Sequence, residues 1–386
     1  MRKTKISVLS VAALSAALVF DALACTVAIV GKKASTTGCV IVGHNEDNAM
    51  VRVRHGLVPA RDWPVGAVLP AEPGMAAIPQ VPRTLGFFWS QMKSAEGHVP
   101  AGDSFLNEKG VLVVSDNAGP TKVDPADGSR LTDGGMFYNL RRAVAERATS
   151  ARDAVRVVGE LVERWGYAPP GRIYTVADAD EGWMVQVVGC RQWVARRCPD
   201  DAIAVCPNHY TIHSIPPEPT DDCLYSSNLV AHAVAKGWWP PDRPFDFAAA
   251  YQATNWWKIA HNTGRQTLLT SLLLGRAWRD ESYPFCVKAA RKVSPEDVKA
   301  ALCAHGDGGG KPHVDDFDRP ALCRAQTVES LVCAYAKPLA GTVLHVSGHH
   351  PCTSGYRAVK PLSGEPLPAA FDDGDAAARL DAHLAK

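Results

Sequence analysis

The residue with the clearest chemical potential is Cys25, at the junction of an apolar run and a strand-like segment, "DALACTVAIVG". A basic start precedes the apolar run Ile6–Phe20, and residues 22–24 read Ala-Leu-Ala. This order is typical of a secretory signal with a small-x-small cleavage site. We therefore predict a signal peptide over residues 1–24, removal by signal peptidase, and a secreted or periplasmic mature chain that begins with Cys25.

A chain that begins with cysteine carries two reactive groups on one residue. A free thiol has a pKa of about 8.5, and an α-amino group has a pKa of about 7.7–8.0. At neutral pH part of the amine is uncharged and can take the thiol proton, so Cys25 supplies both nucleophile and base. The predicted chemistry is acyl transfer from an amide, and the uncleaved precursor is expected to be inactive.

Two other interpretations of Cys25 compete with this one. A lipid-anchored cysteine normally follows a large apolar residue at position −3 and a small one at −2, and here Ala22 and Leu23 stand in the reverse order. A disulfide is the common state of exported cysteines. The chain has 11 cysteines, so at least one is left over, and setting Cys25 aside leaves ten for disulfides.

Metal chemistry has little support in the sequence. The pairs His209/His213 and His349/His350 have neither the His-Glu-x-x-His spacing nor a nearby acid, and no Cys-x-x-Cys is present. We expect no cofactor and no catalytic metal. The 41 basic and 40 acidic residues balance, which makes nucleic acid an improbable partner, and no apolar run reaches the roughly 20 residues of a membrane span.

The elements expected to position these residues form an α+β pattern. Alternating, β-branched runs predict strands early in the chain and again after residue 170, with helices between them and helices after residue 226. A further strand is expected over 339–346 and long loops over 56–103. Ser294 followed by Pro295 and an acid at position 297 is a helix-start signature. We treat residues 25–386 as one catalytic domain.

Motifs along the chain resemble a known family. "CTVAIVGKKASTTGCVIVGHNED", "IYTVADADEGWMVQVVG", "PNHYTI", "CRAQTVES" and "PCTS" resemble the N-terminal-nucleophile dipeptidases of the dipeptidase A and secernin type. These are related to penicillin V acylase and conjugated bile acid hydrolase. The resemblance implies a four-layer αββα sandwich, in which helices cover two antiparallel sheets, and a mature N-terminal cysteine as nucleophile.

The same resemblance implies roles for five further residues. Asp47 matches an acid that holds the α-amino group, while Asn117 and Asn208 match oxyanion-hole residues. Arg276, in "RAWR", matches a late active-site arginine. His44 stands where relatives carry arginine, and we expect it to contact substrate, although an imidazole titrates near neutrality and a guanidinium does not.

The predicted function is thus an exported, metal-free cysteine amidohydrolase, and we expect it to act as a dipeptidase. An acylase that cleaves bile-salt or penicillin V type N-acyl amides would use the same mechanism. A non-catalytic, disulfide-stapled binding protein is the alternative from another class. It requires Cys25 to be paired, so the state of this thiol separates it from both enzymes.

Overall fold

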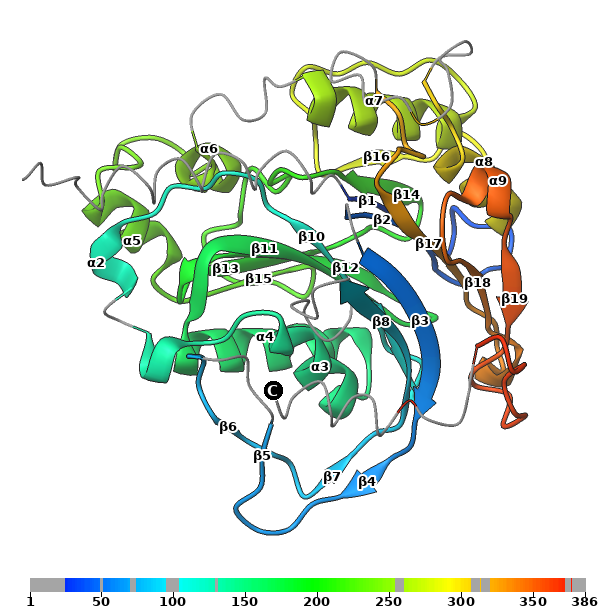
Figure 1. Cartoon of the computed structure of the whole chain (residues 1–386). Helices are drawn as coiled ribbons and strands as arrows, with labels where there is room; N and C mark the ends of the chain where they lie inside the picture. The colour runs from blue at the N-terminus through cyan, green and yellow to red at the C-terminus, as the bar shows by residue number, and fades with distance from the viewer. Residues whose placement is uncertain are drawn as a thin grey trace, which may run out of the picture.

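The computed structural model describes residues 25–48, 51–69, 74–94, 104–128, 131–253, 260–306, 313, 320–371 and 376. The predicted signal peptide lies outside these residues. Two large sheets dominate, and every pairing between their strands is antiparallel. Figure 1 shows them stacked face to face, with helices above and below.

The seven-stranded sheet contains the predicted nucleophile. Its order is β16 (Cys286–Lys288), β14 (Ala202–Cys206), β1 (Thr26–Val30), β2 (Ile41–Asp47), β17 (Thr327–Ala334), β18 (Val343–Ser347) and β19 (Arg357–Val359). The expected hairpin of β1 and β2 lies at its centre, where both faces of each strand are covered. This central position explains why β1 is apolar almost without interruption and why the polar residues at the end of β2 are buried.

The eight-stranded sheet lies against it. Its order is β15 (Cys223–Tyr225), β13 (Trp193–Arg197), β12 (Gly182–Cys190), β11 (Tyr167–Ala177), β10 (Leu112–Asn117), β9 (Phe105–Asn107), β8 (Phe87–Ser94) and β3 (Val51–Val58). The expectation of long loops over 56–103 is therefore wrong in part, because β3 pairs with β8 along eight residues. Two small ladders fill the rest: β4 (Arg61–Asp62) with β7 (Arg83–Thr84), and β5 (Val68–Leu69) with β6 (Ile78–Pro79).

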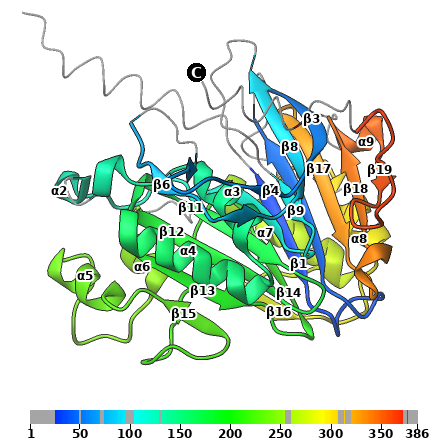
Figure 2. The ribbon, with the colours of Figure 1, turned by 90° about the horizontal axis from the view of Figure 1, so that it is seen from below.

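Helices form the two outer layers. α3 (Asn139–Arg147) and α4 (Ala151–Trp165) cover the eight-stranded sheet, as Figure 2 shows from below. α7 (Ala260–Leu274) and α8 (Pro295–Leu302) cover the seven-stranded sheet. The Ser294 signature is a complete capping box. The shorter helices are α2 (Pro125–Gly128), α5 (Leu229–Ala235), α6 (Phe247–Tyr251) and α9 (Pro351–Ser354), with 3₁₀ turns at Thr132–Gly134 and Leu339–Gly341.

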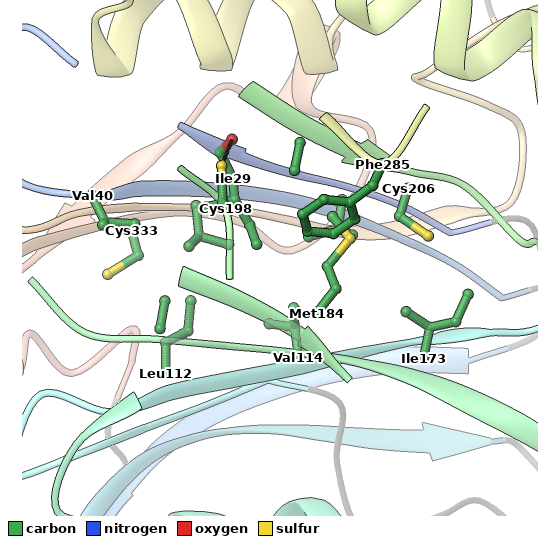
Figure 3. Packing of buried hydrophobic residues seen from close by; sticks show 14 of the residues in the cluster. Ile29, Val40, Leu112, Val114, Ile173, Met184, Cys198, Cys206, Phe285 and Cys333 are labelled. Carbon is green, nitrogen blue, oxygen red and sulfur yellow. Dashed lines mark hydrogen bonds between the residues drawn. The ribbon is translucent and has the colours of Figure 1, made fainter. Parts of the chain in front are cut away.

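Three buried clusters define the layers. One lies between the sheets and joins Ile29 and Val40 to Val114, Ile173 and Met184 (Figure 3). The second packs α3 and α4 on one sheet, and the third packs α7 and α8 on the other. The predicted α+β class and its four-layer αββα arrangement are therefore confirmed. None of the described helices is long and apolar enough to cross a membrane.

The cysteines are distributed through these layers. No disulfide joins any of them in the described residues. Five cysteines belong to the cluster between the sheets: Cys39, Cys198, Cys206, Cys223 and Cys333. Their sulfur atoms fill core volume as small apolar groups do, so the expectation of a disulfide framework is not met in this structure.

Candidate active site

Cys25 precedes β1, and its side chain lies between the two sheets. Val27 and Ile29, two and four residues further on, belong to the cluster between the sheets, so the alternation of the strand places Cys25 on the same face. Only 1% of the residue is exposed. Its Sγ donates a hydrogen bond to Oε2 of Glu46 at 3.1 Å. The thiol therefore has a carboxylate within proton-transfer distance.

The register of the hairpin explains this contact. Thr26 pairs with Asn45 and Val27 with His44. Continuing the pairing by one residue sets Cys25 opposite Glu46. Side chains that face each other on antiparallel strands have Cβ atoms about 4.5–5.5 Å apart, which allows a thiol to reach a carboxylate.

The polar side chains of β2 face two different layers of the fold. His44 and Glu46 share the inner face with Val42, whereas Asn45 and Asp47 face the helices. Asn45 Nδ2 donates to the carbonyl oxygens of Leu302 and Leu322, at 3.0 and 2.7 Å. The motif "HNED" thus serves two environments, one on each side of the sheet.

His44 is fully buried and lies close to the Cys25 thiol. Its Nε2 lies 3.4 Å from Oδ1 of Asp116, on β10 of the other sheet, and both side chains are fully inaccessible to solvent. A donor atom of His44 also lies within 4.8 Å of Cys25 Sγ and of a Glu46 oxygen. The structure therefore places His44 in the inner part of the site, in contact with protein groups.

Arg265 is the cation in direct contact with Cys25. It comes from α7 and is fully buried. Its Nη1 donates to the Cys25 carbonyl oxygen at 2.5 Å and to Thr26 Oγ1 at 2.6 Å, and its Nη2 donates to Asn208 Oδ1 at 2.8 Å. Burial lowers the pKa of Arg265 to about 10, which still leaves the guanidinium charged at neutral pH. One planar side chain thus connects the nucleophile to a predicted oxyanion-hole residue.

Asn208 and Asn117 lie together, as the resemblance implies. Asn208 Nδ2 donates to the backbone oxygen of Asn117 at 3.0 Å, and Arg265 fixes the opposite end of the Asn208 amide. These two contacts determine which side of the amide carries the N–H groups. The second Asn208 N–H is chemically able to donate to a developing oxyanion.

Asp47 is buried on the helix-facing side of β2. Its Oδ1 accepts a hydrogen bond from Thr327 Oγ1 at 2.5 Å, and its Oδ2 makes no hydrogen bond with the described residues. Burial raises the pKa of Asp47 to about 6, despite the opposing effects of Arg324, Thr327 and Arg265. Because Cys25 stands opposite Glu46, the amino side of Cys25 points along the sheet toward Asp47.

The pKa of Asp47 predicts a specific pH dependence of stability. Its folded pKa is higher than its unfolded value of about 3.9, so the folded state binds the proton more tightly and loses stability as pH rises from about 4 to about 6. Two pKa units correspond to about 3 kcal/mol. In a chain that retains Ala24, Asp47→Asn is expected to gain about this much unfolding free energy over wild type between pH 4 and pH 7. Urea unfolding of both proteins at each pH measures the difference.

The same measurement on mature protein tests the role of Asp47. An α-ammonium on Cys25 beside Asp47 would lower the pKa of this carboxyl, so the pH-dependent difference should shrink once Ala24 is removed. An identical pH dependence in the two forms would show that Asp47 does not hold the amine.

Arg276 requires a correction. The structure places it beyond the end of α7, exposed, where its backbone N–H bonds to Ser271 O. The helix carries the chain about 14 Å from Arg265 to Leu274, at 1.5 Å per residue, so Arg276 is remote from Cys25. Arg276 therefore lies past the end of the helix that carries Arg265, and Arg265 is the arginine that contacts Cys25.

The residues that sequence reasoning missed are Glu46, Arg265 and Asp116. Glu46 was detectable, since strand alternation puts it on the same face as His44 and opposite Cys25. Arg265 gave no such signal, because a polar helix residue is normally assigned to solvent.

Metal ligation at this site needs separate consideration. Cys25, His44 and Glu46 each offer a donor atom within 4.8 Å of the other two, and all three are buried. Three protein donors with an open position are the arrangement of a catalytic zinc site. In this structure a hydrogen bond joins Cys25 Sγ to Glu46 Oε2, so a proton rather than a metal ion links these two groups. The sequence-based candidates His209 and His213 are bonded elsewhere, to Gln266 and to Asp246.

A cavity of about 530 Å³ is lined in part by His209, the residue that follows Asn208 in the sequence. Its other lining residues include Tyr210, Asp246 and Tyr283, but not Cys25. Burial lowers the pKa of His209 to about 3, so this wall of the cavity carries a neutral imidazole at neutral pH. The cavity is separate from the reacting thiol.

Comparisons with known proteins identify a peptidase family and several dipeptidases as similar sequences. Residues 123–314 match Peptidase family C69. The chain is 26% identical over 305 residues to a probable dipeptidase of Latilactobacillus sakei, covering 73% of this chain and 60% of that protein. It is also 26% identical over 298 residues to dipeptidase A of Lactobacillus helveticus, covering 73% and 61%. The chain thus spans about three fifths of the length of these relatives.

A solved structure is also similar in outline. Conjugated bile acid hydrolase from Clostridium perfringens aligns over 89% of this chain and 95% of its own, with 12% identity and a TM-score of 0.43.

Proposed function

This chain belongs to Peptidase family C69, and from that premise we propose that it is an exported dipeptidase whose nucleophile is the thiol of Cys25. The observation that carries the proposal is the placement of Cys25: the thiol has an acceptor at 3.1 Å, and Arg265 holds the carbonyl of the same residue. A buried structural cysteine needs neither contact.

The proposed reaction begins when the α-amine of Cys25 takes the thiol proton. The thiolate attacks the peptide carbonyl carbon, and charge develops on the carbonyl oxygen. Asn208 Nδ2 and the neighbouring Asn117 supply the donors for that oxygen. The ammonium returns the proton to the leaving amine, a thioester remains on Cys25, and water hydrolyses it with the amine again as base.

Two features support this assignment of the base. Asp47 offers a buried carboxylate oxygen with no hydrogen-bond partner among the described residues, on the side of β2 toward which the Cys25 amine would project. Glu46 is the competing proton acceptor, because it already receives the thiol hydrogen bond. In this proposal Glu46 orients the thiol, and the amine carries the proton through the reaction.

Export is part of the same proposal. The basic start, apolar run and Ala-Leu-Ala site of residues 1–24 support cleavage before Cys25. Only a cleaved chain has a basic nitrogen on this residue.

A substrate panel on mature protein tests the proposed activity. Protein with a verified Cys25 N-terminus is incubated with dipeptides, tripeptides and N-acyl amino acids, and free amino acids are measured by mass spectrometry. We expect hydrolysis of dipeptides and loss of activity after thiol alkylation. Cleavage of N-acyl amino acids alone would assign the acylase function, and inactivity on the whole panel would favour a binding protein.

A further inference from the structure

Four potential metal ligands meet at one edge of the seven-stranded sheet, away from Cys25. His305 follows α8, Cys323 precedes β17, Cys352 lies in α9, and His313 comes from the segment between α8 and β17. One donor atom of each lies within 4.8 Å of those of the other three.

Two of the three distances below are close to the edges of a tetrahedral zinc site, and the third, between His313 and Cys352, is shorter. His313 Nε2 lies 3.0 Å from Cys352 Sγ and 3.6 Å from Cys323 Sγ, and the two sulfur atoms are 3.5 Å apart. With Zn–S of about 2.3 Å and Zn–N of about 2.0–2.1 Å, tetrahedral geometry requires about 3.8 Å between sulfurs and about 3.6 Å between sulfur and nitrogen. A disulfide would require an S–S distance of about 2.05 Å.

The surroundings of His305 and His313 suit both side chains to bind a metal as neutral imidazoles. His305 Nε2 is buried and has no hydrogen-bond partner among the described residues. The ring of His350 stacks on His313 with centroids 3.8 Å apart, and His350 Nε2 donates to the Ala325 carbonyl oxygen at 3.0 Å. His350 therefore restricts the orientation of the His313 ring, as outer groups do around metal-bound imidazoles.

The donor types explain why the site would suit a cation. Two thiolates packed together need a nearby positive charge, and imidazole nitrogens donate to the same kind of ion. A divalent ion would release two thiol protons and neutralise the thiolates.

We propose that His305, His313, Cys323 and Cys352 bind one structural Zn²⁺ ion. Two thiolates and two imidazoles are a typical zinc donor set, and four protein ligands leave no open position for substrate. The ion would join the end of α8, the segment before β17 and α9, which are far apart in the sequence.

The proposed ion lies behind residues that connect to the active site. Cys323 is followed by Arg324, whose Nη1 lies 2.5 Å from Nε2 of His261 on α7. Cys323 is preceded by Leu322, whose carbonyl oxygen accepts from Asn45 of β2. Zinc bound at Cys323 would therefore fix the backbone that positions Leu322 and Arg324, without touching the reacting atoms.

Metal analysis of purified protein tests the proposal. The full chain is expected to contain about one zinc per molecule after dialysis, and cobalt substitution should give the absorption bands of a tetrahedral thiolate complex. Cys352→Ser and His305→Gln should reduce bound zinc to about zero. Cys352 is half-buried at the start of a short helix, so its loss is unlikely to prevent folding.

Two cysteine variants provide matched controls. Cys303→Ser alters a half-buried thiol next to the cluster, and Cys286→Ser alters a half-buried thiol on β16. Both should retain one zinc. Chelation of the wild type should lower its melting temperature by several degrees, and zinc should restore it. Chelation should lower the melting temperature of Cys286→Ser as much as that of the wild type. It should leave the melting temperature of Cys352→Ser unchanged.

Several results would overturn the proposal. They are a metal-free wild type that does not take up added zinc, a Cys323–Cys352 disulfide in the native protein, or zinc that persists in Cys352→Ser. Zinc lost in Cys25→Ala would assign the metal to the catalytic thiol instead. Because the readout is metal content and stability, failure of the dipeptidase proposal leaves this test intact.

Discussion

Mature protein with Cys25→Ala is expected to lose dipeptide hydrolysis, on the order of 10⁶-fold in turnover, because removal of a covalent nucleophile costs about this much in serine proteases. Cys25→Ser keeps the size of the side chain but presents a far less acidic hydroxyl, so most activity should also be lost. Both variants should remain folded, because each replaces one small side chain by another of similar size. Steady-state rates and circular dichroism measure the two effects.

An N-terminal extension isolates the role of the amine. A chain that starts at Ala24 has an amide at Cys25, which cannot accept a proton, while every side chain of the site is unchanged. We expect this form to be folded, open to alkylation at Cys25 and inactive, with activity restored when an aminopeptidase removes Ala24. Full activity with Ala24 verifiably in place would transfer the role of base to Glu46, the other acceptor within reach of the thiol.

Arg265→Lys should reduce kcat/KM by on the order of 100-fold, the typical cost of losing one group that stabilises the transition state. Lysine keeps the charge but has no planar fork, so it cannot bond Cys25 O, Thr26 Oγ1 and Asn208 Oδ1 together. Truncation to methionine should also cost about 3–5 kcal/mol of unfolding free energy, because buried polar partners are left unmatched. Kinetics and urea unfolding of both variants test these values.

Arg276→Lys is the matched comparison, at an exposed arginine just beyond the end of the same helix. A surface substitution of this kind should change the unfolding free energy by less than about 0.5 kcal/mol. We expect its kcat/KM to stay within about twofold of wild type. The reverse pattern, with Arg276→Lys inactive and Arg265→Lys active, would restore the assignment made from the "RAWR" motif.

Local signals in the sequence determined much of the architecture. The apolar, β-branched run of Cys25–Val30 and the apolar start of Ile41–Asp47 predict two strands, and successive side chains on each strand point to opposite faces. The antiparallel register of this hairpin then sets Cys25 opposite Glu46. The helix starts at Ser150 and Ser294 are local as well, since each capping side chain bonds a backbone N–H three residues away.

Long-range features could be decided only by the tertiary structure. α7 buries His261, Asn262, Arg265 and Gln266, although a polar helix face normally indicates solvent. Burying such groups is favourable only when each finds a partner, and the partners come from distant segments, such as the carbonyl of Cys25. The cluster of His305, His313, Cys323 and Cys352 is equally hidden, because its spacings match no short metal motif. Sequence alone therefore predicted the candidate nucleophile and the strands around it, whereas the tertiary structure decided which arginine contacts Cys25 and which cysteines meet.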